Sequence, residues 1–160
     1  MHPRLKSGKQ FLFEVKLNWL EDYKGILHAN DVEGTIHVGT ARSLWGEGEN
    51  WSPEHLFISS LSSCYMSTLL SFADKMGFNF SHFECNAIGQ IELVSGKYKF
   101  TYINLYPKIF INDNILREKA IEAAKKTQEN CLIMNSMEAA IIYHTEIFTE
   151  KYTLTPVNEI

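Results

Sequence analysis

Residues 52–77, SPEHLFISSLSSCYMSTLLSFADKMG, predict one long helix. Ser52 suits the N-cap, Pro53 suits the first helical position, and Gly77 supplies a C-terminal stop. Glu54 lies in the first turn, where the positive end of the helix dipole favours a carboxylate. Large apolar side chains occur around most of the circumference (Leu56, Phe57, Ile58, Leu61, Met66, Leu69, Leu70, Phe72 and Met76). This spread is too broad for a helix that lies on a surface, so we expect a core helix.

Small polar residues interrupt the apolar helix. They are serines, at Ser59, Ser60, Ser62, Ser63 and Ser67. A serine hydroxyl in a helix can bond back to a carbonyl one turn earlier, and its small size lets other backbone approach. Cys64 lies among these serines, about three turns into the helix.

The residues before this helix predict a small sheet. In residues 11–19, apolar Phe, Val, Leu and Trp alternate with mostly polar residues, which indicates a strand with one buried face. Residues 24–30 and 34–39 predict two more short strands, so we expect a three-stranded antiparallel meander. The loop TARSLWGEGENW, residues 40–51, joins the sheet to the helix, and such loops often carry site residues.

The residues after the helix predict a long hairpin, residues 79–111, that turns at residues 95–97. Cys85 alternates with core residues in its first strand, and we interpret it as packing. Pro107 in the second strand indicates an edge or a bulge.

A second helix is predicted at residues 115–130, capped by Asp113 or Asn114. A short helical turn follows Cys131 at residues 132–137, and residues 139–148 predict a last strand.

The predicted order is βββ-α-ββ-α-β, in the α+β class, with curved antiparallel sheets wrapped on a long central helix. The chain of 160 residues fits a single domain, residues 1–160, with a core of about residues 11–149 and a polar tail at residues 150–160. One protomer would leave part of the apolar helix uncovered, so we expect an intertwined homodimer.

Composition excludes several classes of protein. The apolar share of 45% and the charged share of 21% are those of ordinary globular chains and not of disordered or fibrous ones. A formal net charge of -4, without a Lys/Arg cluster, argues against a nucleic-acid partner. Residues 1–10 are not followed by an apolar signal segment, and we expect no run to be long or uniform enough to span a bilayer. We therefore expect a cytoplasmic protein with no membrane partner.

Three cysteines lie far apart in the sequence, at Cys64, Cys85 and Cys131. No CxxC and no Cys/His pair has metal-ligand spacing, so we expect no structural zinc site. A thiol is nucleophilic only as its thiolate, which needs a feature that lowers its pKa. Cys64 alone is typical of a small packing residue. Cys131, between a helix and a helical turn, is either a buried cap residue or a thiolate stabilised by free N–H groups.

Residues 52–77 resemble the signature helix of the OsmC/Ohr family, which carries a Pro-Glu pair and a leucine-containing stretch that ends at a cysteine. Residues 119–137, KAIEAAKKTQENCLIMNSM, resemble the second motif of that family, a helix that ends in a cysteine and a short turn. The resemblance covers roughly residues 11–149. The Arg-Asp-Gly motif of the Ohr branch is absent, which favours another OsmC-like branch. Leu132 and Ile133 follow Cys131, where the family often has proline and a small polar residue.

The resemblance implies a thiol-dependent peroxidase that reduces organic hydroperoxides and hydrogen peroxide without metal or flavin, at a site on a homodimer interface. It implies that Cys64 is the peroxidatic thiol and Cys131 the resolving thiol. It also implies that Glu54 binds and orients a catalytic arginine. A lipoyl protein, thioredoxin or a small thiol would then reduce the disulfide.

Any of three arginines could supply the guanidinium. Arg42, in the loop before the helix, is the best placed; Arg4 and Arg117 are the others. Glu47 and Glu49 are alternatives to Glu54 as its partner. A surface role for Arg42 is the simpler alternative.

Three more residues of this region have two readings each. His55 is either a site residue or a surface residue at the helix terminus, and the dipole favours the latter. Trp45 and Trp51 either wall an apolar peroxide pocket or act as aromatic staples at the helix entrance.

Two other functions compete with the peroxidase. One is a catalytically silent OsmC-like protein that binds a small apolar ligand at the dimer interface. The other is a hot-dog-like acyl-thioester hydrolase, which also wraps a sheet around a long helix but gives neither cysteine a role.

Overall fold

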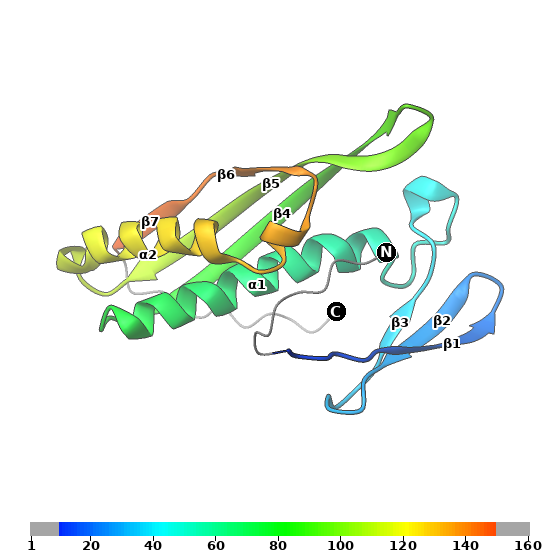
Figure 1. Cartoon of the computed structure of the whole chain (residues 1–160), viewed down its shortest axis with the longest axis horizontal. Coiled ribbons are helices and arrows are strands. Elements are labelled where there is room, and N and C mark those ends of the chain that lie inside the picture. Colours follow the sequence, from blue (N-terminus) through cyan, green and yellow to red (C-terminus); the bar gives the residue numbers. More distant parts are fainter. Residues whose placement is uncertain (1–9, 150–160) are drawn as a thin grey trace. The chain divides into compact units, whose positions relative to one another are not determined.

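A computed structural model describes residues 10–149. They form an α+β fold, as the sequence predicts, and its elements follow the predicted order except that the last strand is divided in two (Figure 1). The strands are β1 Lys16–Glu21, β2 Lys24–His28, β3 Ile36–Val38, β4 His82–Val94, β5 Lys97–Ile111, β6 Ala140–Tyr143 and β7 Glu146–Thr149. The α-helices are α1 Pro53–Lys75 and α2 Arg117–Asn130. Short 3-10 turns occur at Arg42–Leu44, Asn114–Leu116 and Met134–Ser136.

The chain divides into two compact units, one that ends at Leu56 and one that begins at Phe57. The boundary falls within the first turns of α1. The single domain of residues 1–160, with its core at residues 11–149, stays a prediction. The predicted tail at residues 150–160 lies outside the described residues.

The first unit contains the predicted three-stranded antiparallel meander, in the order β1-β2-β3. Leu17 pairs with Leu27, which pairs in turn with Ile36. The predicted buried face of the first strand is not buried in the single chain. β1 begins only at Lys16, and the side chains of Leu17 and Trp19 are 61% and 73% exposed. Strand alternation marks which face is apolar, but an apolar face is buried only where something covers it.

α1 has the predicted N-cap at its start and the predicted stop signal at its end. The Ser52 Oγ accepts a hydrogen bond from the backbone N–H of His55 at 3.3 Å, as an N-cap does. At the other end Gly77 is left-handed, with φ 65°, and its N–H donates to the Asp74 carbonyl at 3.1 Å. The Phe78 N–H donates to the Ala73 carbonyl at 3.1 Å, which completes a Schellman motif.

α1 is a core helix on one face only. Leu61, Tyr65, Leu69 and Ala73, spaced four residues apart, are buried. Other large apolar side chains of the helix stay exposed: Phe57 at 37%, Met66 at 41% and Leu70 at 48%. The predicted back-bonding of its serines is confirmed, for example by the Ser67 Oγ, which donates to the Ser63 carbonyl at 3.0 Å.

α1 also corrects the expectation that no run could span a bilayer. It has 23 residues and an 18-residue window of mean hydropathy 1.4, so by length and composition alone it is long and apolar enough to cross a membrane. Core helices of soluble proteins have the same property, and Leu61, Tyr65 and Leu69 have no solvent exposure within the second unit.

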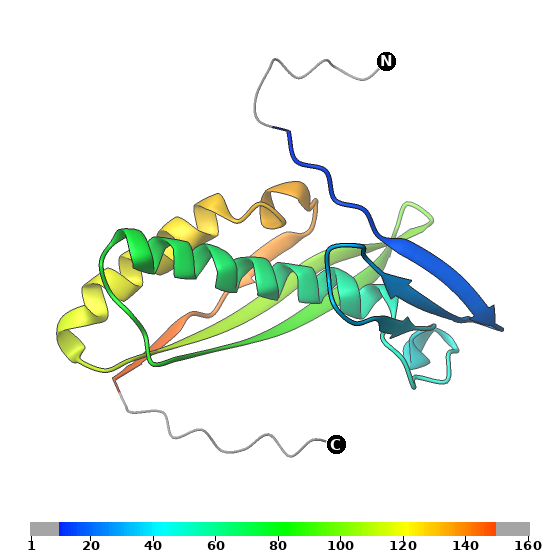
Figure 2. The ribbon, with the colours of Figure 1, turned by 90° about the horizontal axis from the view of Figure 1, so that it is seen from below.

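The second unit is built on β5, which pairs with three strands. β4 lies antiparallel to β5 across a tight hairpin, and Ser95 and Gly96 form the turn with φ 51° and 77°. β6 and β7 both run parallel to β5, so this sheet is mixed and not wholly antiparallel. The chain returns to β5 through α2, and a crossover connection of that kind places the next strand parallel. Both helices cover the same face of the sheet (Figure 2).

Pro107 lies within the central strand, neither at an edge nor at a bulge. β5 pairs with β6 as far as Leu105 and with β7 from Lys108 onward. Pro107 is opposite Cys85 on its other side, and the register shift between β4 and β5 lies at Gln90 and Ile91. Proline has no N–H to give to a neighbouring strand. The partner strand is interrupted at this point, which is why the predicted last strand becomes β6 and β7.

α2 closes the core of the second unit. The Asp113 Oδ1 accepts from the Ile115 N–H at 3.0 Å, so Asp113 caps the 3-10 turn that precedes α2. Small residues on one stripe of α2 are buried, namely Ala120, Ala123, Ala124 and Thr127. They pack in one cluster with α1 and with Ile103, Leu105, Ile109 and Ile111 of β5. Cys131, which ends α2, is fully buried in this cluster.

Candidate active site

The second unit brings Cys64 and Cys131 together, although 66 residues separate them in the sequence. Each thiol changes the pKa of the other through a side-chain hydrogen bond. Both are free thiols, and Cys64 is partly exposed whereas Cys131 is fully buried. A partly accessible thiol therefore lies beside a second one that solvent does not reach.

The surroundings of Cys64 favour its thiolate. Burial by itself raises the pKa of Cys64, but hydrogen bonds from the Cys131 thiol, the Ile133 N–H, the Thr68 hydroxyl and the Leu132 N–H outweigh it, so the pKa is lowered. The Thr68 Oγ1 lies 4.0 Å from the Cys64 Sγ, one turn along α1. Thr68 was not singled out from the sequence, although its spacing of four residues from Cys64 was a usable signal.

The surroundings of Cys131 favour its neutral thiol. Burial and the neighbouring Cys64 raise the pKa of Cys131 to about 11, against a partial offset from the Met134 and Ile133 backbone. Near neutral pH the pair therefore consists of one thiol inclined to ionise and one that keeps its proton.

The end of α2 explains how backbone N–H groups reach Cys64. Cys131 leaves the helix in an extended conformation, with φ -68° and ψ 116°, and its own N–H still donates to the Thr127 carbonyl at 3.0 Å. The chain then turns into the 3-10 segment Met134–Ser136. The N–H groups of Leu132 and Ile133 lie between these two helical segments, so helix hydrogen bonds do not use them.

Cys85 lies on β4, partly buried. Burial raises its pKa to about 11, although a hydrogen bond from Ser62 partly opposes this. An open groove of about 350 Å³ borders it, lined by Ile58, Ser59, Ser62, Ser63, Cys85, Asn86 and Ala87. A thiol with a raised pKa is a poor nucleophile, and packing stays our interpretation of Cys85.

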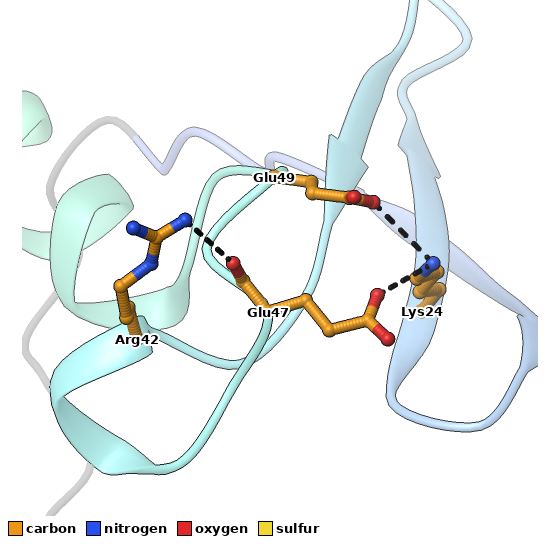
Figure 3. Close-up of polar contacts among 4 residues, drawn as sticks. All are labelled: Lys24, Arg42, Glu47 and Glu49. Carbon is orange, nitrogen blue, oxygen red and sulfur yellow. Dashed lines mark hydrogen bonds and ion pairs between the residues drawn. The ribbon is translucent and has the colours of Figure 1, made fainter.

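Arg42 lies in the first unit, in the loop between β3 and α1 (Figure 3). Its Nη2 donates to the backbone carbonyl of Glu47 at 3.1 Å. A Cβ at Gly46 would overlap the Thr40 carbonyl oxygen, so this close approach within the loop requires glycine. Within residues 10–149, no ion pair joins Arg42 to Glu54, Glu47 or Glu49.

Lys24 fixes the same loop and was not predicted. Its Nζ lies 2.8 Å from the Glu47 carboxylate and 3.5 Å from that of Glu49 (Figure 3). The hydrogen bond and charge of Glu47, with those of Glu49, raise the pKa of Lys24. Glu47 therefore binds Lys24 through its side chain and Arg42 through its backbone. The sequence held no local signal for this contact, because Lys24 precedes Glu47 by 23 residues.

Glu54 lies in the first turn of α1, and its Oε2 is buried without a hydrogen-bond partner in the described part of the chain. It borders an open groove of about 390 Å³ in the first unit, whose other walls include Leu17, Trp19, Tyr23 and Val38. A buried carboxylate oxygen without a donor is disfavoured, so this atom is suited to receive a cation.

The remaining candidates have other contacts. The Nδ1 of His55 lies 2.9 Å from the Ser52 Oγ and accepts from the Ser52 N–H at 3.3 Å, so exposed His55 completes a capping box. Trp51 meets the ring of His55 edge-on, and Trp45 is 94% exposed. The Arg117 Nη1 donates to the Ile147 carbonyl at 3.1 Å. Arg4 lies outside the described residues. Within the described ranges, no cluster of three His, Cys, Asp or Glu side chains could hold a metal ion.

Comparison with known proteins places the chain in a family. A sequence model described as OsmC-like protein matches residues 46–146, which include α1 with Cys64, and α2 with Cys131 at its end. The chain belongs to the OsmC-like protein family. This OsmC-like chain is 21% identical over 139 residues to the uncharacterized protein YmaD of Bacillus subtilis, a match that covers 81% of this chain and 88% of YmaD.

Solved structures share the OsmC-like fold. An OsmC-like protein of unknown function from Vibrio cholerae superposes with a TM-score of 0.75 at 21% identity, over 87% of this chain and all of that one. An organic hydroperoxide resistance protein from Elizabethkingia anophelis gives a TM-score of 0.70 at 16% identity, over 90% of this chain and all of that one. At these identities the likeness shows the fold alone.

Proposed function

We propose that this OsmC-like protein is a thiol-dependent peroxidase that reduces organic hydroperoxides and hydrogen peroxide, with Cys64 as peroxidatic and Cys131 as resolving thiol. The observation that carries the proposal is the asymmetry of the adjacent pair. Hydrogen bonds outweigh burial and lower the pKa of Cys64, whereas burial raises that of Cys131 to about 11. The likeness in fold to an organic hydroperoxide resistance protein from Elizabethkingia anophelis supports the same class of activity.

The reaction follows from this asymmetry. The Cys64 thiolate attacks one peroxide oxygen, the O–O bond breaks, and the alkoxide leaves as an alcohol after it takes a proton. The sulfur is oxidised to a sulfenic acid and the peroxide is reduced by two electrons. The Cys131 thiol then forms the S–S bond, the S–O bond of Cys64 breaks, and the Cys131 proton leaves with that hydroxide as water. A dithiol or two small thiols would reduce the disulfide.

Arg42 and Glu54, both of the first unit, belong to the catalytic residues that we propose. A guanidinium near a thiolate stabilises the anion and can donate to a peroxide oxygen. The buried, unpartnered Oε2 of Glu54 is suited to orient such a guanidinium, and Arg42 lies in the same unit on a loop fastened by Lys24. Only the Nη2 of Arg42 donates to the Glu47 carbonyl, so other N–H groups of the guanidinium are available for the carboxylate of Glu54.

The protein is proposed to work as a homodimer in the cytoplasm, with a lipoyl protein, thioredoxin or a small thiol as reductant. The exposed apolar side chains of α1 and of β1 support a second copy of the chain as partner, because a single chain leaves Met66, Leu70 and Trp19 in water.

One experiment tests the pair directly. The reduced protein is treated with one equivalent of cumene hydroperoxide, digested without reductant and searched by mass spectrometry for a peptide that joins Cys64 to Cys131. We expect that peptide in the native protein and in Cys85→Ser, which is the matched control, and we expect its loss in Cys64→Ser. If peroxide is not consumed and both thiols still titrate, the peroxidase is wrong and the ligand-binding alternative is favoured.

A further inference from the structure

Three hydroxyl groups are buried in the second unit without a hydrogen-bond partner in the part of the chain that is described. They are the phenol oxygens of Tyr65 and Tyr143 and the Oγ1 of Thr145. Tyr65 has no solvent exposure at all. A buried hydroxyl without a partner destabilises a fold, and native proteins usually satisfy such groups with protein or with an ordered water.

The backbone aims these hydroxyls at the helix-covered face of the sheet. Tyr143 ends β6 opposite Leu105, which is fully buried, and Thr145 follows two residues later. His144 between them points the other way, where its ring stacks on Tyr106 at 4.5 Å. Tyr65 reaches the same place from α1, and its ring centroid lies 6.1 Å from that of Tyr143.

The Tyr65 hydroxyl has polar neighbours but forms no direct hydrogen bond with them. Burial raises the pKa of Tyr65 to about 12, and the polar side chains of Thr145 and Gln128 work against that rise. Neither group, however, makes a hydrogen bond of good geometry to the Tyr65 oxygen. A bridging water is a common way to satisfy neighbouring buried polar groups that no direct hydrogen bond joins.

The same hydroxyls lie within electrostatic range of Cys131. Burial raises the pKa of Tyr143, and a negative charge on Cys131 raises it further. A negative charge on Cys131 also raises the pKa of Tyr65. This effect is smaller than those of the burial of Tyr65 and of its neighbours Thr145, Cys85 and Gln128. The packing agrees, because Tyr65 follows Cys64 in α1 and both Tyr65 and Cys131 belong to one core cluster.

We propose that Tyr65, Tyr143 and Thr145 hold an internal water beside Cys131, and that this water donates a hydrogen bond to the Cys131 sulfur as that thiol gives up its proton. Three hydroxyls give the water the two to four polar partners that a buried water needs. The role at Cys131 rests on the proposed function, since the proton leaves when Cys131 closes the disulfide. The water is not consumed: the Cys131 proton goes to the hydroxide that leaves Cys64.

The water site is tested first by stability, without any peroxide. Phenylalanine at position 143 keeps the ring and removes only the hydroxyl. If the hydroxyls share a water, Tyr143→Phe lowers the Tm by roughly 2–4 °C, and Tyr143→Phe combined with Thr145→Val loses less than the sum of the two single variants. If no water is present, Tyr143→Phe should instead raise the Tm, because removal of an unsatisfied hydroxyl stabilises the fold. An unchanged or higher Tm in Tyr143→Phe overturns the proposal; Tyr98→Phe, on an exposed tyrosine, is the control.

The role at Cys131 is tested by its reactivity with pH. In Cys64→Ser, the titratable groups near Cys131 and its water are Tyr65 of α1 and Tyr143 of β6, whose pKa values a charge on Cys131 raises, and Cys85 of β4, whose charge raises the pKa of Tyr65. We expect Tyr143→Phe to move the alkylation of Cys131 to higher pH, and Tyr98→Phe to leave it unchanged. An unmoved pH profile overturns the role at Cys131.

A kinetic measurement separates this role from the proposed function. With Cys64 present, stopped-flow mixing with peroxide should show an unchanged first oxidation and a disulfide step slowed by about tenfold in Tyr143→Phe. If both steps slow equally, the role at Cys131 is wrong. If no peroxide reacts, the peroxidase itself is wrong, and the Tm and alkylation results still decide on the water.

Discussion

The backbone N–H of Leu132 is one of the groups that lower the pKa of Cys64. Its side chain is 69% exposed, so the N–H and not the side chain matters here. The extended backbone of Cys131, with ψ 116°, also suits a following proline. Leu132→Pro therefore removes one hydrogen-bond donor, and the backbone of Cys131 can keep its conformation before the proline.

We expect Leu132→Pro to raise the pKa of Cys64, because a thiolate loses a donor that the neutral thiol does not need. The thiolate fraction near neutral pH should fall by about threefold to tenfold. The measurement is the rate at which iodoacetamide labels Cys64, followed by mass spectrometry as a function of pH. Leu132→Ala keeps the N–H and is the matched control. Equal labelling curves for the two variants would show that this N–H does not stabilise the thiolate.

The residues of the candidate site divide into those that a sequence can reveal and those that it cannot. Cys64 and Cys131 are conspicuous by residue type and by their motifs, and their adjacency follows from the packing of α1 against α2 and the turn after it. The donors to Cys64 from Leu132 and Ile133 are backbone groups, so no residue type announces them. Lys24 reaches Glu47 from another strand, and long-range pairs of common surface charges leave no sequence pattern.

At the scale of elements, Gly77 ends α1 in a conformation that other residues adopt at a cost. Its φ is 65°, and a Cβ added there would meet nothing within 4 Å. Gly77→Ala therefore tests backbone strain without steric overlap. We expect it to lower the free energy of unfolding by about 1–2 kcal/mol in urea denaturation. Gly77→Asn should lose less, since asparagine tolerates the left-handed region. Equal stability of the alanine variant and the native protein would contradict this account of the helix end.

The elements were predicted where a local signal sets them. The caps at Ser52, Asp113 and Gly77 act within a few residues, so the helix ends followed from sequence. The division of the last strand into β6 and β7 did not. It depends on Pro107, which lies far away in the chain and comes opposite the break only after α2 has brought the strand back parallel to β5.

At the scale of the whole molecule, the exposed face of α1 predicts the oligomeric state. Met66 and Leu70 are 41% and 48% exposed although they lie in the helix on which the core is built. A second copy of the chain that covers this face would bury them. Charged side chains at both positions would then have to lose their hydration in the dimer, which is strongly unfavourable.

We expect the native protein to sediment as a dimer and the variant Met66→Glu with Leu70→Glu to sediment as a monomer at micromolar concentration. Ile115→Glu is the control, because Ile115 is 79% exposed on the 3-10 turn before α2 and its replacement places a glutamate charge away from α1. Circular dichroism must show that the double variant keeps its helices, so that lost association is not lost folding. A monomeric native protein would contradict the proposed dimer. A double variant that still dimerises would exclude this face as the interface and would favour the exposed apolar side chains of β1, Leu17 and Trp19, as the surface for a second copy.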